Sequence, residues 1–121
     1  MTISSHKDLI VWQKAKRVAI LVYSLTDKFP HEEKYGLTSQ IRRSAVSVVA
    51  NIAEGRGRNT RKDFVNFLHF SLGSCTELET ELIISKELSF GTLGEYTEIE
   101  GLLIEVQKML NVMIKKLKAI S

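Results

Sequence analysis

The densest group of side chains able to bind an anion lies between positions 55 and 62, in the run GRGRNTRK. Its basic members are Arg56, Arg58, Arg61 and Lys62, and Arg42 and Arg43 precede them along the chain. Guanidinium and ammonium groups bind phosphate oxygens, and the intervening glycines let another backbone approach closely. The run therefore predicts phosphate-directed binding of RNA or DNA, although an ordinary solvated turn has the same composition.

No base-reading pattern accompanies these basic residues. The run contains no aromatic side chain on which a base could stack, and no recognition-helix pattern flanks it. We expect any nucleic-acid binding to lack strong sequence specificity.

The residue types that carry catalysis are present, but they are scattered. His6, His31 and His69 fall in a predicted tail, linker and helix, and none has a second metal ligand three or four residues further on. Cys75 falls on a predicted core stripe, which favours a packing role over a nucleophile. We expect no enzyme activity, no cofactor and no metal.

Length and composition are those of one globular domain, residues 1–121, with 44% hydrophobic and 26% charged residues. The longest apolar run, Val18 to Tyr23, is far too short to cross a membrane. The N-terminal residues MTISSHKD do not resemble a secretory signal, and a lone cysteine suits a reducing compartment. We therefore expect a cytoplasmic protein without membrane contact.

Charge is segregated along the sequence, although the net charge is only +3. Residues 37–62 contain six basic residues and one acidic residue, whereas residues 63–100 contain one basic and eight acidic residues. Such a field can steer an anionic partner to one end, or pair the basic part of one subunit with the acidic part of another.

Apolar periodicity predicts four helices, at about residues 8–28, 37–54, 61–88 and 93–119. Phe29-Pro30 ends the first, and Gly55 is expected to end the second as a left-handed residue. Thr60 with Asp63, and Thr92 with Glu95, resemble capping boxes at the starts of the third and fourth.

The fourth segment repeats apolar residues at alternating spacings of four and three, which is typical of coiled-coil-like packing. The repeat comprises Ile99, Leu103, Val106, Leu110, Met113, Leu117 and Ile120. Long helices with short connections predict an all-α, antiparallel up-down-up-down four-helix bundle. Further apolar residues point away from the main stripes of the first and fourth helices: Ile10, Val11, Val18, Ile20, Leu21, Leu102, Met109, Val112 and Ile114. This surplus predicts a homo-oligomer.

A polar stripe on the second helix is unusual for a solvent-facing surface. It comprises Gln40, Ser44, Ser47, Asn51 and Glu54, and serine and asparagine are poor helix formers. We expect another surface to pack on it. On the third helix Gly73 and Ser74 are expected to permit close approach, with Glu77 and Glu81 facing a basic neighbour such as Arg43.

The chain resembles the four-helix-bundle proteins encoded by intervening sequences of bacterial 23S ribosomal RNA genes. The segments that match are DLIVWQKA, FPHEEKYGL, LTSQIRRSAVSVVANIAEGRGR and DFVNFLHFSLGSCTELETEL. This resemblance implies a ring of five subunits. It also implies kinship with the accessory proteins of diversity-generating retroelements, basic pentamers that bind nucleic acid and a reverse transcriptase.

Two functions agree with these observations. In the first, the oligomer binds nucleic acid through Arg42, Arg43, Arg56, Arg58, Arg61 and Lys62. In the second, the oligomer is a scaffold for a protein partner, or an accessory subunit of a nucleic-acid enzyme, and its charges serve assembly.

Overall fold

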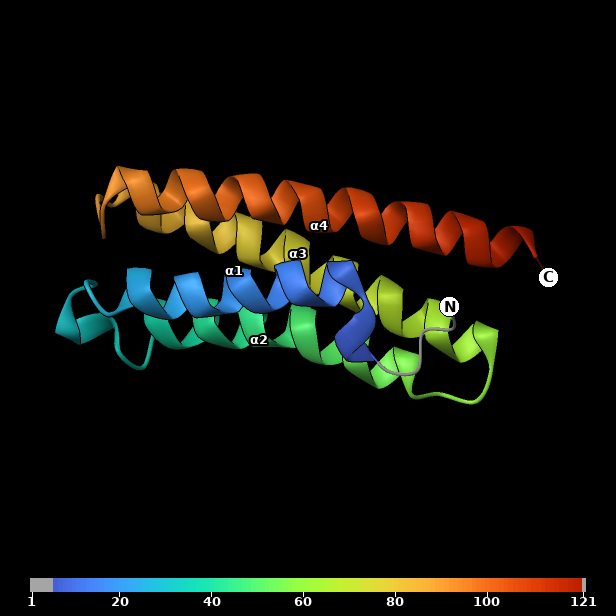
Figure 1. Ribbon diagram of the computed structural model, residues 1–121. Coiled ribbons are helices and arrows are strands. Elements are labelled where there is room, and N and C mark those ends of the chain that lie inside the picture. Colours follow the sequence, from blue (N-terminus) through green and yellow to red (C-terminus); the bar gives the residue numbers. More distant parts are fainter. Residues whose placement is uncertain (1–5, 121) are drawn as a thin grey trace.

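Between His6 and Ile120, the part of the chain that this computed structural model describes, the protein forms four α-helices and two short 3-10 helices and no strand (Figure 1). The helices are η1 (His6–Asp8), α1 (Ile10–Thr26), η2 (His31–Glu33), α2 (Leu37–Arg56), α3 (Arg61–Glu87) and α4 (Leu93–Ala119). Residues 1–5 and 121 of the predicted domain lie outside the description. The four α-helices begin and end within about two residues of the predicted positions.

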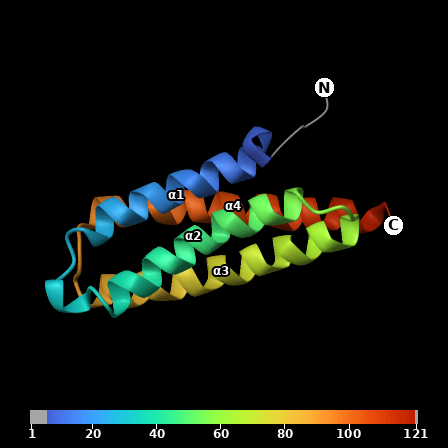
Figure 2. The ribbon, with the colours of Figure 1, turned by 90° about the horizontal axis from the view of Figure 1, so that it is seen from below.

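Consecutive α-helices run in opposite directions along the long axis of the molecule (Figures 1 and 2). Each packs against its neighbours in sequence, and α4 returns to pack against α1. The predicted up-down-up-down bundle is confirmed. One end of the bundle holds the α2–α3 loop, residues 57–60, and the last turns of α4; the opposite end holds the α1–α2 and α3–α4 connections (Figure 1).

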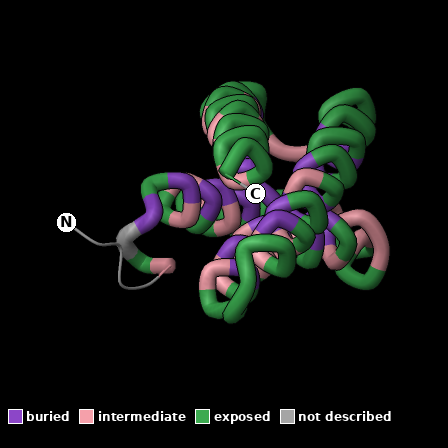
Figure 3. Tube along the Cα trace, turned by 90° about the vertical axis from the view of Figure 1, so that its right-hand side faces the viewer, coloured by how far each residue is buried: buried purple, intermediate pink, exposed green. Residues whose placement is uncertain are grey.

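One face of each helix forms the core, and Figure 3 shows the buried residues mainly on the sides that face other helices. In α4 the predicted repeat holds from Ile99 to Leu110. Beyond that point Ile114 is buried, whereas Met113 and Leu117 are half-buried and Ile120 is exposed. A straight helix has 3.6 residues per turn rather than 3.5, so a strict seven-residue repeat rotates out of the core.

Small residues bring α2 and α3 close together. The Ser47 and Ser74 hydroxyl oxygens lie 2.8 Å apart, and the Ser71 hydroxyl donates to the carbonyl oxygen of Val48 over 2.8 Å. The expectation that another surface packs on the polar stripe is thus met at Ser47. Gly73 has no such role, because a Cβ placed there would meet nothing within 4 Å.

The expectation that Gly55 ends the second helix is wrong. Helix α2 continues to Arg56, and its C-cap, Gly57, has a right-handed φ of −84°. The glycine at position 55 serves packing instead: a Cβ there would lie 2.7 Å from the Cβ of Phe67 and 3.3 Å from the carbonyl oxygen of Phe64. Both residues belong to α3, so Gly55 sets how closely the two helices meet.

A left-handed turn does occur between α3 and α4. Ser89 has φ 63° and Gly91 has φ 75°. A side chain at Gly91 would be strained by that backbone and would also lie 2.5 Å from Leu25 Cδ1. The hydroxyl of buried Tyr96 lies 2.8 Å from both the Ser85 hydroxyl and the Phe90 carbonyl oxygen, which ties the turn to α4.

Candidate nucleic-acid interface

The α2–α3 loop and the helix ends beside it hold four of the six predicted basic residues at one end of the bundle. Arg56 closes α2 and Arg61 opens α3, so the loop between them has only four residues. Thr60 is the N-cap of α3, and its hydroxyl accepts a hydrogen bond from the Asp63 N–H over 3.1 Å, which is one of the two bonds of the predicted capping box. The cap fixes the direction in which α3, with Arg61 and Lys62, leaves the loop.

Arg58 is held in place by two contacts. Its guanidinium donates to the Glu54 carboxylate over 2.8 Å and lies 4.7 Å from the centre of the Phe67 ring. The ion pair offsets part of its charge, and at this exposed position it stabilises the fold only slightly. Arg61 and Lys62 are exposed on the first turn of α3. These two residues, next to the loop, are therefore accessible to a ligand.

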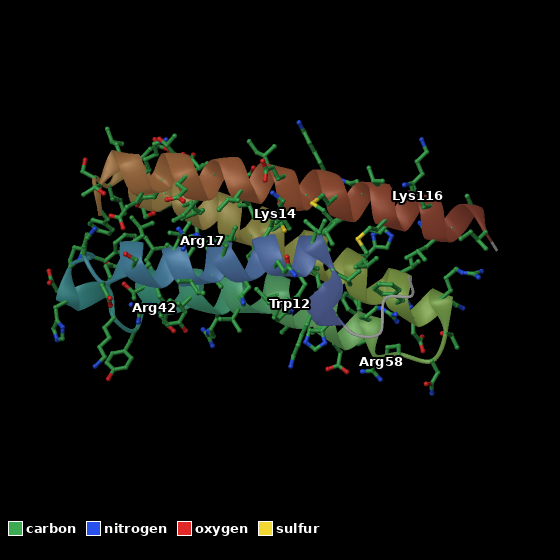
Figure 4. The ribbon with its side chains drawn as sticks, viewed as in Figure 1. Trp12, Lys14, Arg17, Arg42, Arg58 and Lys116 are labelled. Carbon is green, nitrogen blue, oxygen red and sulfur yellow. The ribbon has the colours of Figure 1, made fainter. Side chains whose placement is uncertain are left out.

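The last turns of α4 add three lysines to the same end: Lys115, Lys116 and Lys118. Figure 4 shows Lys116 and Arg58 toward the same end of the molecule. Sequence reasoning missed these lysines because they do not belong to the arginine run. The sequence did contain the necessary information, because helices that alternate in direction place the end of α4 at the same end of the bundle as the α2–α3 loop.

Arg42 does not join this group. It lies toward the opposite end of the bundle (Figure 4). Its Nε donates to the Thr26 hydroxyl over 2.8 Å, one terminal nitrogen lies 3.0 Å from the Asp27 carboxylate, and the guanidinium is 4.5 Å from the centre of the Tyr23 ring. These contacts tie the end of α1 to α2, so Arg42 is a structural residue here.

Arg43 lies in a polar groove between α2 and α3 of about 430 Å³, together with Glu77 and Glu81. The groove confirms that these residues share a surface, as expected from the sequence, although it does not place Arg43 near the α2–α3 loop. Glu81 is only 8% exposed, and its Oε1 atom has no hydrogen-bond partner among the described residues. Burial raises the pKa of Glu81, a hydrogen bond with Ser44 opposes the shift, and Glu77 adds to it.

The side chains considered for catalysis are the three histidines, on η1, η2 and α3, and Cys75, also on α3. No group of three or more His, Cys, Asp or Glu side chains suited to a metal ion exists within residues 6–120. Cys75 is fully buried, and burial together with the charge of Glu79 raises the pKa of its thiol to about 12. The thiol therefore stays protonated at neutral pH, in keeping with the predicted packing role.

The predicted apolar surplus is smaller than expected, because Val11, Val18 and Ile114 belong to the core. Ile20 remains 55% exposed and Val46 45% exposed. They line a shallow groove of about 310 Å³ between α1 and α2, with Lys16, Ala19, Tyr23 and Val49. None of the helices that the structure describes is both long and apolar enough to cross a membrane.

The helices form a small antiparallel four-helix bundle. The α2–α3 loop, the start of α3 and the last turns of α4 give one end of this bundle an excess of basic residues. The chain belongs to the 23S rRNA-intervening sequence protein family, which it matches over residues 7–112. A similar solved structure is that of a protein with unknown function from the S23 ribosomal protein family of Bacteroides thetaiotaomicron. It shares 28% sequence identity with a TM-score of 0.80, over 88% of this chain and 99% of that chain. No curated protein matches the chain.

Proposed function

We propose that this protein is a non-enzymatic homo-oligomer of the bacterial cytoplasm that binds RNA through one end of the bundle, without strong sequence specificity. One observation carries the proposal: basic residues from two distant parts of the chain lie at the same end. Residues 54–63 and 113–119 together contain seven basic and two acidic residues. We call the basic members of these two segments the basic end. The family's name records where its genes lie and does not name a ligand; we propose RNA in preference to DNA, and the titration below compares the two.

Assembly into an oligomer increases the affinity of the basic end for RNA. We propose a ring of five subunits, in line with the family resemblance and with the exposed apolar residues between α1 and α2. Each subunit then contributes one basic end. Repetition converts weak individual phosphate contacts into high overall affinity along one strand.

A second function is favoured by the apolar groove beside Ile20 and Val46. An exposed apolar surface can receive another protein as well as another subunit. In that case the oligomer is a scaffold or an accessory subunit of a nucleic-acid enzyme, as the resemblance to retroelement accessory proteins implies. The charges would then serve assembly.

A salt titration of binding separates the two functions. Affinity is measured for a single-stranded RNA, a structured RNA and a duplex DNA between low and physiological salt. Each phosphate contact contributes about −0.7 to the slope of log affinity against log salt on single strands and about −0.9 on duplex DNA. Replacing Arg61 and Lys116 together with alanine should weaken binding equally for unrelated sequences and flatten the slope, with the oligomer mass unchanged.

The matched control removes the same charge elsewhere. Lys34→Ala with Lys108→Ala changes exposed lysines outside the basic end and should leave the slope nearly unchanged. Absence of binding at physiological salt, or equal effects of the two double variants, would favour the scaffold. If the Arg61 and Lys116 variant dissociates instead, these residues belong to a subunit contact.

A further inference from the structure

A groove of about 470 Å³ lies at the basic end, between the start of α3 and the end of α4. Its apolar floor is formed by buried Val65 and half-buried Leu117. Arg61, Lys62 and Lys118 surround the floor, and the Asn66 amide also lines the groove. Its volume is within the range of about 300–1,000 Å³ that is usual for small-molecule sites.

The groove exists because α3 and α4 extend further than α1 and α2 at this end of the bundle. Figures 1 and 2 show α3 and α4 extending past the start of α1 at this end. The inward face of α4 therefore has only α3 opposite its last turns. Leu117 remains half-buried here, whereas the equivalent residues nearer the middle of α4, such as Leu103 and Leu110, are fully covered.

The chemistry of the lining selects its ligand. Three basic side chains favour an anion, the apolar floor favours a flat apolar group, and the amide of Asn66 can both donate and accept a hydrogen bond. A simple inorganic anion would make no use of the floor. A nucleotide has a phosphate, a base with apolar faces and a polar base edge, so it complements all three features.

We propose that this groove holds one unpaired nucleotide of an RNA strand, with the base on Val65 and Leu117 and its phosphate beside Arg61 and Lys62. The inference rests on the proposed function and narrows it to single-stranded RNA, because the bases of a duplex are stacked and paired and do not enter such a groove. Every base has apolar faces, so the site tolerates any sequence.

Comparison of two probes tests the groove separately from the charges. One is a short oligouridine, and the other is an abasic chain of the same length, which keeps the sugars and phosphates. The protein should bind oligouridine about tenfold more tightly, a difference that corresponds to about 1.4 kcal/mol. Leu117→Ser should remove that preference while leaving the affinity for the abasic chain unchanged. Asn66→Ala, at an exposed position, provides a second variant that should reduce the preference.

Leu93→Ser is the matched control, because it makes the same change at an exposed residue of the opposite end. It should alter neither affinity. Equal binding of both probes by the unmodified protein overturns the inference but leaves the proposed function standing, whereas no binding of either overturns both. A lower oligomer mass for Leu117→Ser would mean that a second copy of the chain packs on the groove, and that result also overturns the inference.

Discussion

Glu81 couples folding to pH through its burial between α2 and α3. Its pKa in the folded protein lies above the ordinary value of 4.5, so the folded state holds the proton more tightly than the unfolded state. Stability from this residue is therefore greatest below pH 4.5 and is lost as the pH rises through the folded pKa. Arg43 and Glu77, which line the same groove, change this dependence through their own charges.

Glu81→Gln should accordingly raise the urea midpoint of unfolding at pH 7, and the difference from the unmodified protein should shrink toward pH 4.5. Glutamine keeps the size of the side chain and removes the buried charge. Glu87→Gln, at an exposed position of the same helix, should change the midpoint little at any pH. A Glu81→Gln protein that is less stable at pH 7 would show that the carboxylate is ion-paired in the assembled protein.

The roles of single arginines were the part of the site least predictable from sequence. Composition groups Arg42 with Arg58, but the two lie toward opposite ends of the bundle (Figure 4). Arg42 is tied down by Thr26, Asp27 and Tyr23, which precede it by 15 residues or more. Contacts of that kind depend on how α1 packs on α2, and helical periodicity does not contain that information.

The α2–α3 pair is the element most sensitive to side-chain size. Gly55→Ala should destabilise the protein by about 1–3 kcal/mol, because the added Cβ meets the Cβ of Phe67 and cannot be accommodated without moving a helix. Gly73→Ala provides the control and should stabilise by about 0.5–1 kcal/mol, since it adds a better helix former facing open space. Urea unfolding of both variants measures the two effects. Equal shifts for both would contradict the packing role of Gly55.

Helix positions were predictable because each carries its own apolar period and its own end signals. Thr60 and the Phe29-Pro30 pair are local signals, and they place boundaries well. The close approach at Gly55 is a property of two helices together, so the sequence indicated that glycine mattered there and suggested the wrong reason. The incomplete burial of Met113 and Leu117 has a similar origin, since it depends on how straight α4 is and on which helices reach its last turns.

At the scale of the whole molecule, we expect an assembly with a mass about five times the 13.7 kDa of one chain. Light scattering at micromolar concentration measures it directly. Ile20→Glu combined with Val46→Glu places charge on the apolar groove between α1 and α2 and should shift the mass toward that of one chain. The Arg61 and Lys116 double variant should keep the full mass. A monomer in the unmodified protein would remove the repetition on which the proposed affinity depends.

The up-down order of the helices and the charged segments together determine the shape of the electric field. The basic end carries a positive excess, whereas residues 27–43 and 81–100, toward the other end, together contain eight acidic and five basic residues, so the bundle has a dipole along its length. In a ring with rotational symmetry about an axis parallel to the bundles, these dipoles would add. One rim would then attract a polyanion and the other would repel it. The two faces of such a ring are therefore not equivalent, and an RNA strand at low salt should bind only to the face that carries the basic ends.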